Sequence, residues 1–141
     1  MILLDTDHFS VLRYARDPKY DTLTSKMRSS IDSRFAITVI TLEEQLRGWL
    51  AEINRLRDIA KQVTVYERLA GLVELMSEWE IVRLDPPSAI LFRELKNRRI
   101  RLGSNDLKIA SIALANNAFL LTANRADFQR VPGLQIANWL E

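Results

Sequence analysis

The chain opens on Met1-Ile-Leu-Leu-Asp5, and this short stretch constrains the fold more than any other. Its apolar residues follow one another without polar alternation, which is typical of a strand buried on both faces. Strands of that kind belong to parallel sheets that are covered by crossover helices. Asp5 stands where the strand ends, at the carboxyl edge of the sheet, where open α/β folds bind their ligands. We therefore expect a parallel sheet with a polar site at one edge.

The rest of the chain alternates between the patterns of strands and helices. Further strands are expected at residues 35–40, 81–84, 118–122 and 134–136. Helices are expected at residues 6–14, 22–31, 41–56, 63–79, 88–97 and 107–116, with 41–56 and 63–79 forming a hairpin. This order predicts an α/β fold: a central parallel sheet of four to five strands flanked by helices.

Size and composition limit what surrounds this fold. A chain of 141 residues is long enough for one domain with a real core, so we expect a single domain over residues 1–141. The opening apolar run is too short for a signal peptide or a membrane span, which predicts no membrane association. The absence of cysteine excludes disulfides and thiolate metal sites, and fits a cytoplasmic protein.

Four acidic residues are expected at the carboxyl edge. Asp5 ends the first strand, and Glu44 lies in the first turn of the helix after the second strand. Asp106 opens the helix that follows the third strand and its helix, and Asp127 follows the fourth strand. Because all strands of a parallel sheet point the same way, segments far apart in sequence deliver these acids to one edge. Together they predict one acidic site.

Each acid also has a structural explanation of its own. Thr41-x-x-Glu44 matches a capping box at a helix start. Asp106 and Asp127 suit a first helical turn and a loop turn, respectively. Asp5 is the hardest to explain in this way, because a charge beside a buried strand is costly unless it is paired or bound to a metal.

The expected cluster favours a divalent cation and a polyanionic substrate. Crowded carboxylates repel one another unless cations lie between them, and oxygen ligands without cysteine predict Mg²⁺ or Mn²⁺ rather than zinc. Such ions activate water for attack on a phosphodiester. The chain has 20 Lys and Arg against 18 Asp and Glu, so outside a four-acid cluster 20 basic residues face 14 acids. An acidic pocket on a basic body is typical of enzymes that act on nucleic acids.

Four motifs and a closing segment span the whole chain in order. They are Leu3-Leu-Asp5-Thr-Asp7, Thr38-Val-Ile-Thr41-Leu-Glu-Glu44-x-x-x-Gly48, Asn105-Asp106-Leu-x-Ile-Ala110, Leu121-Thr122-x-Asn124-x-x-Asp127-Phe128 and Val131-Pro-Gly-Leu. In this the sequence resembles the PIN-domain ribonucleases, and within them the VapC toxins of bacterial toxin–antitoxin pairs. The resemblance implies a Mg²⁺- or Mn²⁺-dependent endoribonuclease that cuts structured RNA, commonly tRNA or rRNA. It also implies silencing by a cognate antitoxin protein and a homodimer as the usual form.

The resemblance also assigns the acids, position by position. The family's catalytic and metal-binding acids fall on Asp5, Glu44, Asp106 and Asp127. Gly48 lies four residues after Glu44, and this spacing selects Glu44 rather than Glu43. Many members have an aspartate where this chain has Asn124, so either Asn124 or Asp127 completes the site.

Other polar residues are expected to support the acids or to contact RNA. The supporting residues are Thr6, Asp7, Thr122 and Asn124. The expected contacts to the RNA backbone are Arg47, Arg98, Arg99 and Arg101, with a surface ion pair as the alternative for Arg47 and a solvated loop for the others. His8 is expected to be structural, and Trp49, Trp79 and Trp139 are expected to anchor the core or an interface.

Two other functions compete with the nuclease. Asp5-x-Asp7 after an apolar strand also resembles the haloacid dehalogenase phosphatases, but residue 9 is Phe, no later aspartate pair follows, and the chain is short for that fold. The second is a catalytically inactive PIN-like module that binds RNA or protein. Against it, all four acidic positions are filled.

Overall fold

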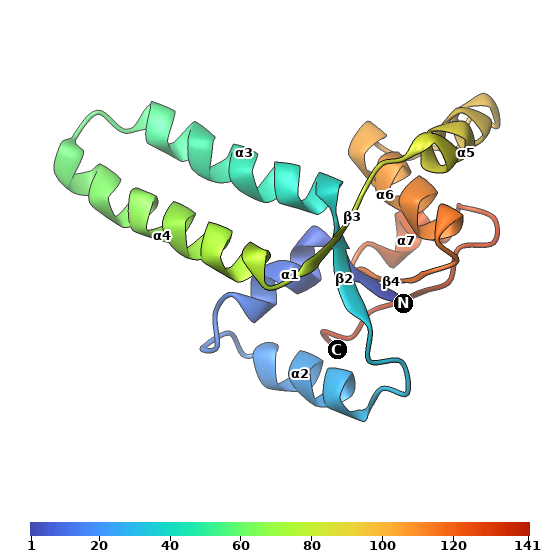
Figure 1. Cartoon of the computed structure of the whole chain (residues 1–141), viewed down its shortest axis with the longest axis horizontal. Coiled ribbons are helices and arrows are strands. Elements are labelled where there is room, and N and C mark those ends of the chain that lie inside the picture. Colours follow the sequence, from blue (N-terminus) through green and yellow to red (C-terminus); the bar gives the residue numbers. More distant parts are fainter.

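Five short strands form one parallel sheet at the centre of the molecule, in the order β3-β2-β1-β4-β5 (Figure 1). The computed structural model describes residues 1–141. The strands are β1 (Ile2–Leu4), β2 (Phe35–Thr38), β3 (Glu80–Val82), β4 (Phe119–Leu121) and β5 (Ile136–Ala137). The helices are α1 (Thr6–Leu12), α2 (Tyr20–Ser29), α3 (Val39–Arg55), α4 (Ile59–Ser77), α5 (Pro86–Asn97), α6 (Ser104–Ala115) and α7 (Arg125–Phe128). The predicted fold class, a parallel α/β sheet flanked by helices, is confirmed.

The first strand lies in the middle of the sheet, as its apolar sequence predicts. Leu3 is in register with Ala36 of β2 on one side and with Leu120 of β4 on the other. Because successive side chains of a strand point to opposite faces, Leu3 packs into one core cluster while Ile2 and Leu4 pack into the other. All three are buried. The sheet thus positions the residue after Leu4 at its carboxyl edge.

Two layers of helices cover the two faces of the sheet. One core cluster includes Leu95 of α5, Ile109 of α6 and Phe128 of α7. The other includes Phe9 of α1, Leu23 of α2 and residues of α4. The chain therefore has the covered sheet that its unbroken apolar strands require.

Helices α3 and α4 form the expected hairpin, which projects from the sheet on one side (Figure 1). Near the sheet, Leu72 and Met76 of α4 are buried in the core. Val73 is exposed beside them, and further out the hairpin exposes the apolar side chains of Leu50, Ile59, Val63 and Tyr66. Although α4 is the longest helix, no helix is long and apolar enough to cross a membrane.

The boundary between β2 and α3 differs from the sequence prediction. The strand ends at Thr38, two residues early, and Thr38 is the N-cap of α3, its hydroxyl oxygen accepting from the Thr41 amide at 3.2 Å. Thr41 is therefore inside the helix, and its buried hydroxyl has no hydrogen-bond partner. The capping-box interpretation of Thr41 and Glu44 is wrong, because Glu44 lies in the second turn. Glu44 is thus free for a role other than closing the helix end.

Two further elements depart from expectation for local reasons. Pro86 and Pro87 open α5 instead of only ending a strand, because Asp85 caps the helix by accepting from the Ser88 amide at 3.0 Å. The segment after β4 forms the short helix α7, where the sequence predicts a turn. The end of α6 is as expected: Asn117 follows it with a φ of 49°, the left-handed conformation that asparagine tolerates.

Candidate active site at the carboxyl edge

Asp5 lies directly after β1 and caps α1 with its own side chain. Its Oδ1 accepts from the Thr6 amide and its Oδ2 from the Thr122 hydroxyl, each at 2.8 Å. The residue is only 7% exposed, and its pKa is raised from 3.8 to about 7, mainly by burial. The negative charge of Asp7 contributes to this rise, while the two hydrogen bonds oppose it. The end of the strand therefore holds the Asp5 carboxyl group in a fixed orientation, in surroundings that disfavour its charged form.

Thr6 joins Asp5 to Glu44. Its amide donates to Asp5, and its hydroxyl donates to Glu44 Oε2 at 2.8 Å. This contact joins the start of α1 to the second turn of α3, across 38 residues of sequence. Two acids from different elements are thus oriented by one threonine.

A second chain of hydrogen bonds joins Asp5 to Asp127. The Thr122 hydroxyl donates to Asp5 and accepts from the Asn124 amide at 3.0 Å. The Asn124 side chain then donates to Asp127 Oδ2 at 2.9 Å, while Arg130 pairs with Oδ1 of Asp127 at 3.1 Å. Asn124 thus lies next to Asp127, and its amide orients that carboxylate.

Asp106 lies in the first turn of α6 and is half-buried. Burial raises the pKa of Asp106, and the negative charges of Glu44, Asp127 and Asp7 raise it further. Asp106 in turn raises the pKa of Asp5. The structure therefore brings all four predicted acids into one field of mutual repulsion at the carboxyl edge of the sheet.

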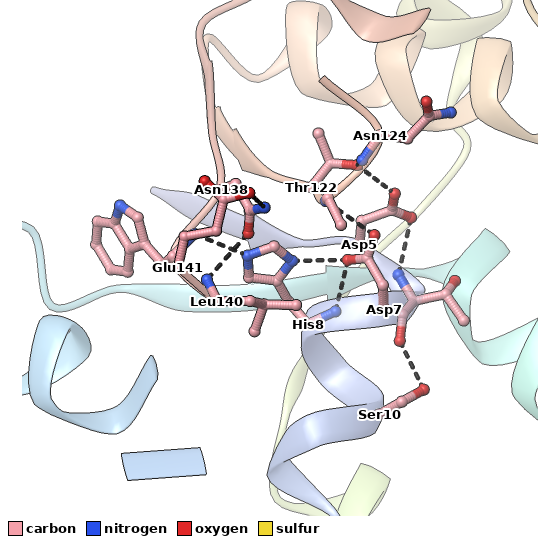
Figure 2. A network of polar contacts seen from close by, with 12 residues as sticks. Asp5, Asp7, His8, Ser10, Thr122, Asn124, Asn138, Leu140 and Glu141 are labelled. Atoms are coloured by element: carbon pink, nitrogen blue, oxygen red, sulfur yellow. Dashed lines mark hydrogen bonds and ion pairs between the residues drawn. The ribbon is translucent and has the colours of Figure 1, made fainter. Parts of the chain in front are cut away.

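Asp7 and His8 connect this edge to the C-terminal segment (Figure 2). Asp7 Oδ2 accepts from the Ala123 amide at 2.8 Å, and Asp7 Oδ1 lies 2.6 Å from His8 Nδ1. The Trp139 amide donates to His8 Nε2 at 3.1 Å, so the neutral ring carries its hydrogen on Nδ1 and donates it to Asp7. His8 is fully buried. It therefore holds Asp7 and the C-terminal segment together, which agrees with the expected structural role.

The predicted basic residues lie apart from the acids. Arg47 is exposed and pairs with Glu43, which is the surface ion pair considered as the alternative. Arg98 ends α5, Arg99 has a φ of 56°, and Arg101 follows in the segment that leads to α6. The carbonyl oxygen of Arg101 accepts from Arg130, the residue that pairs with Asp127. Arg101, at the end of the basic segment, is therefore joined to Asp127 only through Arg130, while contact of the segment with RNA stays a prediction.

The acids fit a hard divalent cation in donor type and in charge. All are carboxylates, and the pKa values of Asp5 and Asp106 are raised first by burial and then by neighbouring negative charge that a cation would relieve. As the side chains stand, however, no group of three or more acidic or histidine residues is arranged to hold a metal ion. Direct coordination of one cation by three of these acids would therefore require the side chains to draw closer together.

Sequence reasoning missed a group of residues that lies beside Glu44. Arg13, Tyr14 and Arg68 gather around Trp49 where α3 packs against the end of α1 and against α4. Of these residues the sequence predicts a role only for Trp49, as a core or interface anchor. The contacts depend on how the hairpin packs, and no local motif signals them.

Comparison with known proteins agrees with this architecture. The PIN-domain profile matches residues 2–134. Ribonuclease VapC1 of Haemophilus influenzae strain R2866 is 31% identical over 114 residues, which cover 77% of this chain and 76% of that protein. The tRNA(fMet)-specific endonuclease VapC of Salmonella typhimurium is 30% identical over 112 residues, covering 76% of each chain.

Solved structures show the same fold over the full length. The VapBC2 complex of Rickettsia felis bound to a promoter DNA fragment contains a chain with a TM-score of 0.72 and 26% identity, covering 99% of both chains. The VapBC-1 complex of nontypeable Haemophilus influenzae gives a TM-score of 0.77 at 23% identity, covering 100% of both chains. By its profile match and its relatives, this chain belongs to the PIN-domain family and groups within it with the VapC ribonucleases.

Proposed function

We propose that the protein is a metal-dependent endoribonuclease that acts as the toxin of a toxin–antitoxin pair. The observation that carries the proposal is the gathering of Asp5, Glu44, Asp106 and Asp127 at one edge of the sheet, where their charges act on one another. Four acids from four separate segments have no common structural purpose that explains this crowding. It also agrees with the names of the relatives, which are ribonucleases.

The side chains of the site would bind the cation, orient one another and take up a proton. When bound, Mg²⁺ or Mn²⁺ would supply the charge that polarises water and stabilises the leaving oxygen of the phosphodiester. Thr6 orients Glu44, and Asn124 orients Asp127. The raised pKa of Asp106 lets this carboxyl group take up a proton more readily than an ordinary aspartate.

The proposed substrate is structured RNA, in the class of tRNA or rRNA. The Salmonella relative is named as specific for tRNA(fMet), which supports this class. The excess of basic residues outside the acidic cluster would attract the polyanion, and Arg98, Arg99 and Arg101 are proposed to hold its backbone beside Asp106. Arg47 contributes only if RNA displaces its pairing with Glu43.

The proposed partners are a cognate antitoxin and a second copy of this chain, in the cytoplasm. The similar structures in Rickettsia and Haemophilus are VapBC complexes, which supports the antitoxin. The apolar side chains that the α3–α4 hairpin exposes are typical of a surface that a protein partner covers. Co-expression with the product of a small reading frame beside the gene, followed by mass measurement of the purified complex, tests both partners.

Cleavage of RNA tests the function directly. The purified protein is expected to produce discrete fragments from total RNA with Mg²⁺ and none with EDTA. Asp106→Asn is expected to lower the cleavage rate by about 10²- to 10³-fold, because it removes one charge at the reacting phosphate while leaving the fold intact. It should also relieve growth arrest in cells. A fully active, fully toxic Asp106→Asn protein would refute the assignment.

Glu44 and Glu43 provide a matched pair. Glu44→Gln is expected to lose most cleavage without losing stability, since Glu44 does not cap its helix and glutamine can still accept from Thr6. Glu43→Gln removes the same charge from the neighbouring residue and frees Arg47 on the surface, so the readout is kcat at saturating RNA, which should stay unchanged. Binding of RNA without cleavage in every variant would favour the inactive module instead.

A further inference from the structure

A polar pocket of about 450 Å³ lies beside Glu44, between the end of α1, helix α3 and helix α4. Its size falls in the range of pockets that hold small ligands or single nucleotides. Glu44 lies on its wall, so the pocket shares this residue with the acidic edge of the sheet. Nothing in the site described above uses the rest of this pocket.

Two arginines without an acidic partner line the pocket. The Arg13 guanidinium carbon lies 5.3 Å from the centre of the Trp49 ring, and that of Arg68 lies 5.6 Å from the same ring. Neither arginine forms an ion pair with a carboxylate. Glu44 and Glu52 also line the pocket, but Glu52 pairs with Arg55 and Glu44 accepts from Thr6. The two guanidinium groups are therefore not paired with either carboxylate.

Hydrogen bonds among neighbouring side chains hold Arg13 in place. Its Nη1 donates to Gln45 Oε1 at 3.0 Å, and Gln45 in turn donates to the Ser10 hydroxyl at 2.9 Å. Burial lowers the pKa of Arg13, and the charge of Arg68 lowers it further, while Tyr14 opposes this. A guanidinium has five N–H donors, so most of those on Arg13 remain for a ligand. An oriented, half-buried cation of this kind is suited to an anion with several acceptor oxygens.

Aromatic rings complete the pocket. Tyr14 is 43% exposed, and the Arg13 guanidinium lies 5.4 Å from the centre of its ring. Trp49 lies between the two arginines and is half-buried. Aromatic and guanidinium planes stack with nucleobases, whereas an acidic peptide would need only the charges. The combination therefore favours a nucleotide over a protein segment.

We propose that Arg13 and Arg68, with Tyr14 and Trp49, form a nucleotide-binding subsite for the RNA residue next to the scissile phosphodiester. The guanidinium groups, which lie against Trp49, bind its phosphate, and its base stacks on the exposed ring of Tyr14. This inference rests on the proposed nuclease function, because Glu44 links the subsite to the acids that act on RNA. It assigns part of the substrate selection to a pocket that is separate from the basic segment at Arg98–Arg101.

Binding is measured in the Asp106→Asn background, where RNA is not cut. The probe is a labelled stem-loop RNA, and its anisotropy is followed in titrations at several salt concentrations. Arg68→Gln should weaken binding and lower the slope of log affinity against log salt by about 0.7, the value for one lost phosphate contact on a single strand. Arg57→Gln, an exposed arginine in the loop between α3 and α4, is the charge-matched control and should leave the slope unchanged.

A second variant tests the pocket without changing a charge. A Cβ at Gly48 would meet no atom within 4 Å, and Gly48 lines the pocket, so Gly48→Leu should narrow it while the helix keeps its stability. Its RNA affinity should fall several-fold.

Steady-state kinetics of the cleaving protein give an independent test. Arg68→Gln should raise KM much more than it lowers kcat, because the substitution affects binding and not chemistry.

The outcomes separate the subsite from the nuclease function. If cleavage with Mg²⁺ is normal but Arg68→Gln and Gly48→Leu bind RNA as Arg57→Gln does, the subsite is wrong and the nuclease stands. If the two pocket variants lose affinity for a labelled polyglutamate peptide but not for RNA, the pocket is a protein-docking site and the proposal is overturned. Absence of cleavage in the unmodified protein refutes the nuclease function itself.

Discussion

The carboxyl edge of the sheet and the outer part of the α3–α4 hairpin contrast in what they bury and what they expose. At the edge, Asp5 is only 7% exposed although it is an acid. On the outer hairpin, Ile59 and Val63 are 73% and 58% exposed although they are apolar. Both arrangements lower the stability of the isolated chain. We therefore propose that each region is stabilised by binding: of a cation and RNA at the edge, and of a protein partner at the hairpin.

The two regions also differ in how firmly they are held. At the edge, Asp5, Glu44 and Asp127 are held by hydrogen bonds from Thr122, Thr6 and Asn124, respectively. The outer hairpin depends on contacts between α3 and α4 alone, away from the sheet. Substitutions at the edge should therefore change activity and pH dependence, and those on the hairpin should change stability according to which face they lie on.

The largest expected effect is on the pH dependence of stability in the metal-free protein. The folded state favours protonated Asp5, so its contribution is full below pH 3.8 and is lost as the pH rises through about 7. The shift corresponds to an upper limit of ~4 kcal/mol in the free energy of unfolding. Asp5→Asn should remove this dependence, and denaturant unfolding in EDTA from pH 4 to 8 measures it.

The comparison of Asp5→Asn with the unmodified protein is the control for other titrating groups. Paired acids such as Glu80, whose pKa is lowered by Arg34, add stability that is lost in acid in both proteins. The pKa of Asp106 is also raised, so in the Asp5→Asn variant the free energy of unfolding still falls somewhat as the pH rises. Equal slopes in the two proteins would show that Asp5 is not held in the way described.

The next effect separates the two faces of the hairpin. Leu72→Ala empties a fully buried position where α4 packs on the sheet, and should lower the free energy of unfolding by about 3 kcal/mol. Val73→Ala, one residue further on an exposed face, should change it by less than about 0.5 kcal/mol. Urea unfolding curves measure both, and similar losses would mean that the hairpin is covered on both faces.

The smallest effect concerns the point where the edge joins the hairpin. Thr38→Ala removes the cap of α3 and should cost about 1 kcal/mol, while Thr38→Ser keeps the hydroxyl and most of the stability. Thr41→Val removes a buried hydroxyl that has no partner and should be neutral or stabilising. Thermal unfolding ranks the stabilities of the three variants. A larger loss of stability in Thr41→Val than in Thr38→Ala would mean that Thr41 caps the helix after all.

Much of the fold and the grouping of the acids follow from local sequence. The apolar run before Asp5 indicates a buried parallel strand, and parallel strands bring Asp5, Asp106 and Asp127 to one edge whatever the details of the helices. The start of α3 could not be read in the same way, because both Thr38 and Thr41 precede a helical pattern and either can cap it. Only the packing of β2 decides that Thr38 does.

The residues that sequence reasoning missed depend on contacts across the fold. Arg13 and Arg68 are 55 residues apart in sequence. They are in contact only because α4 runs back along α3. His8 likewise meets Trp139 only because the C-terminal segment returns past α1. Periodicity shows which face of a helix is apolar, but it does not show which polar residues of two helices meet at a shared end.

The central claim is that acids from separate segments share one electrostatic field that a cation relieves. Carbon-13 NMR titration of the aspartate carboxyl groups tests it most directly. The pKa of Asp106 is expected to lie above its ordinary value of 3.8, to fall in Glu44→Gln, and to fall again when Mg²⁺ is added to the unmodified protein. An Asp106 pKa that neither the substitution nor Mg²⁺ changes would contradict the claim.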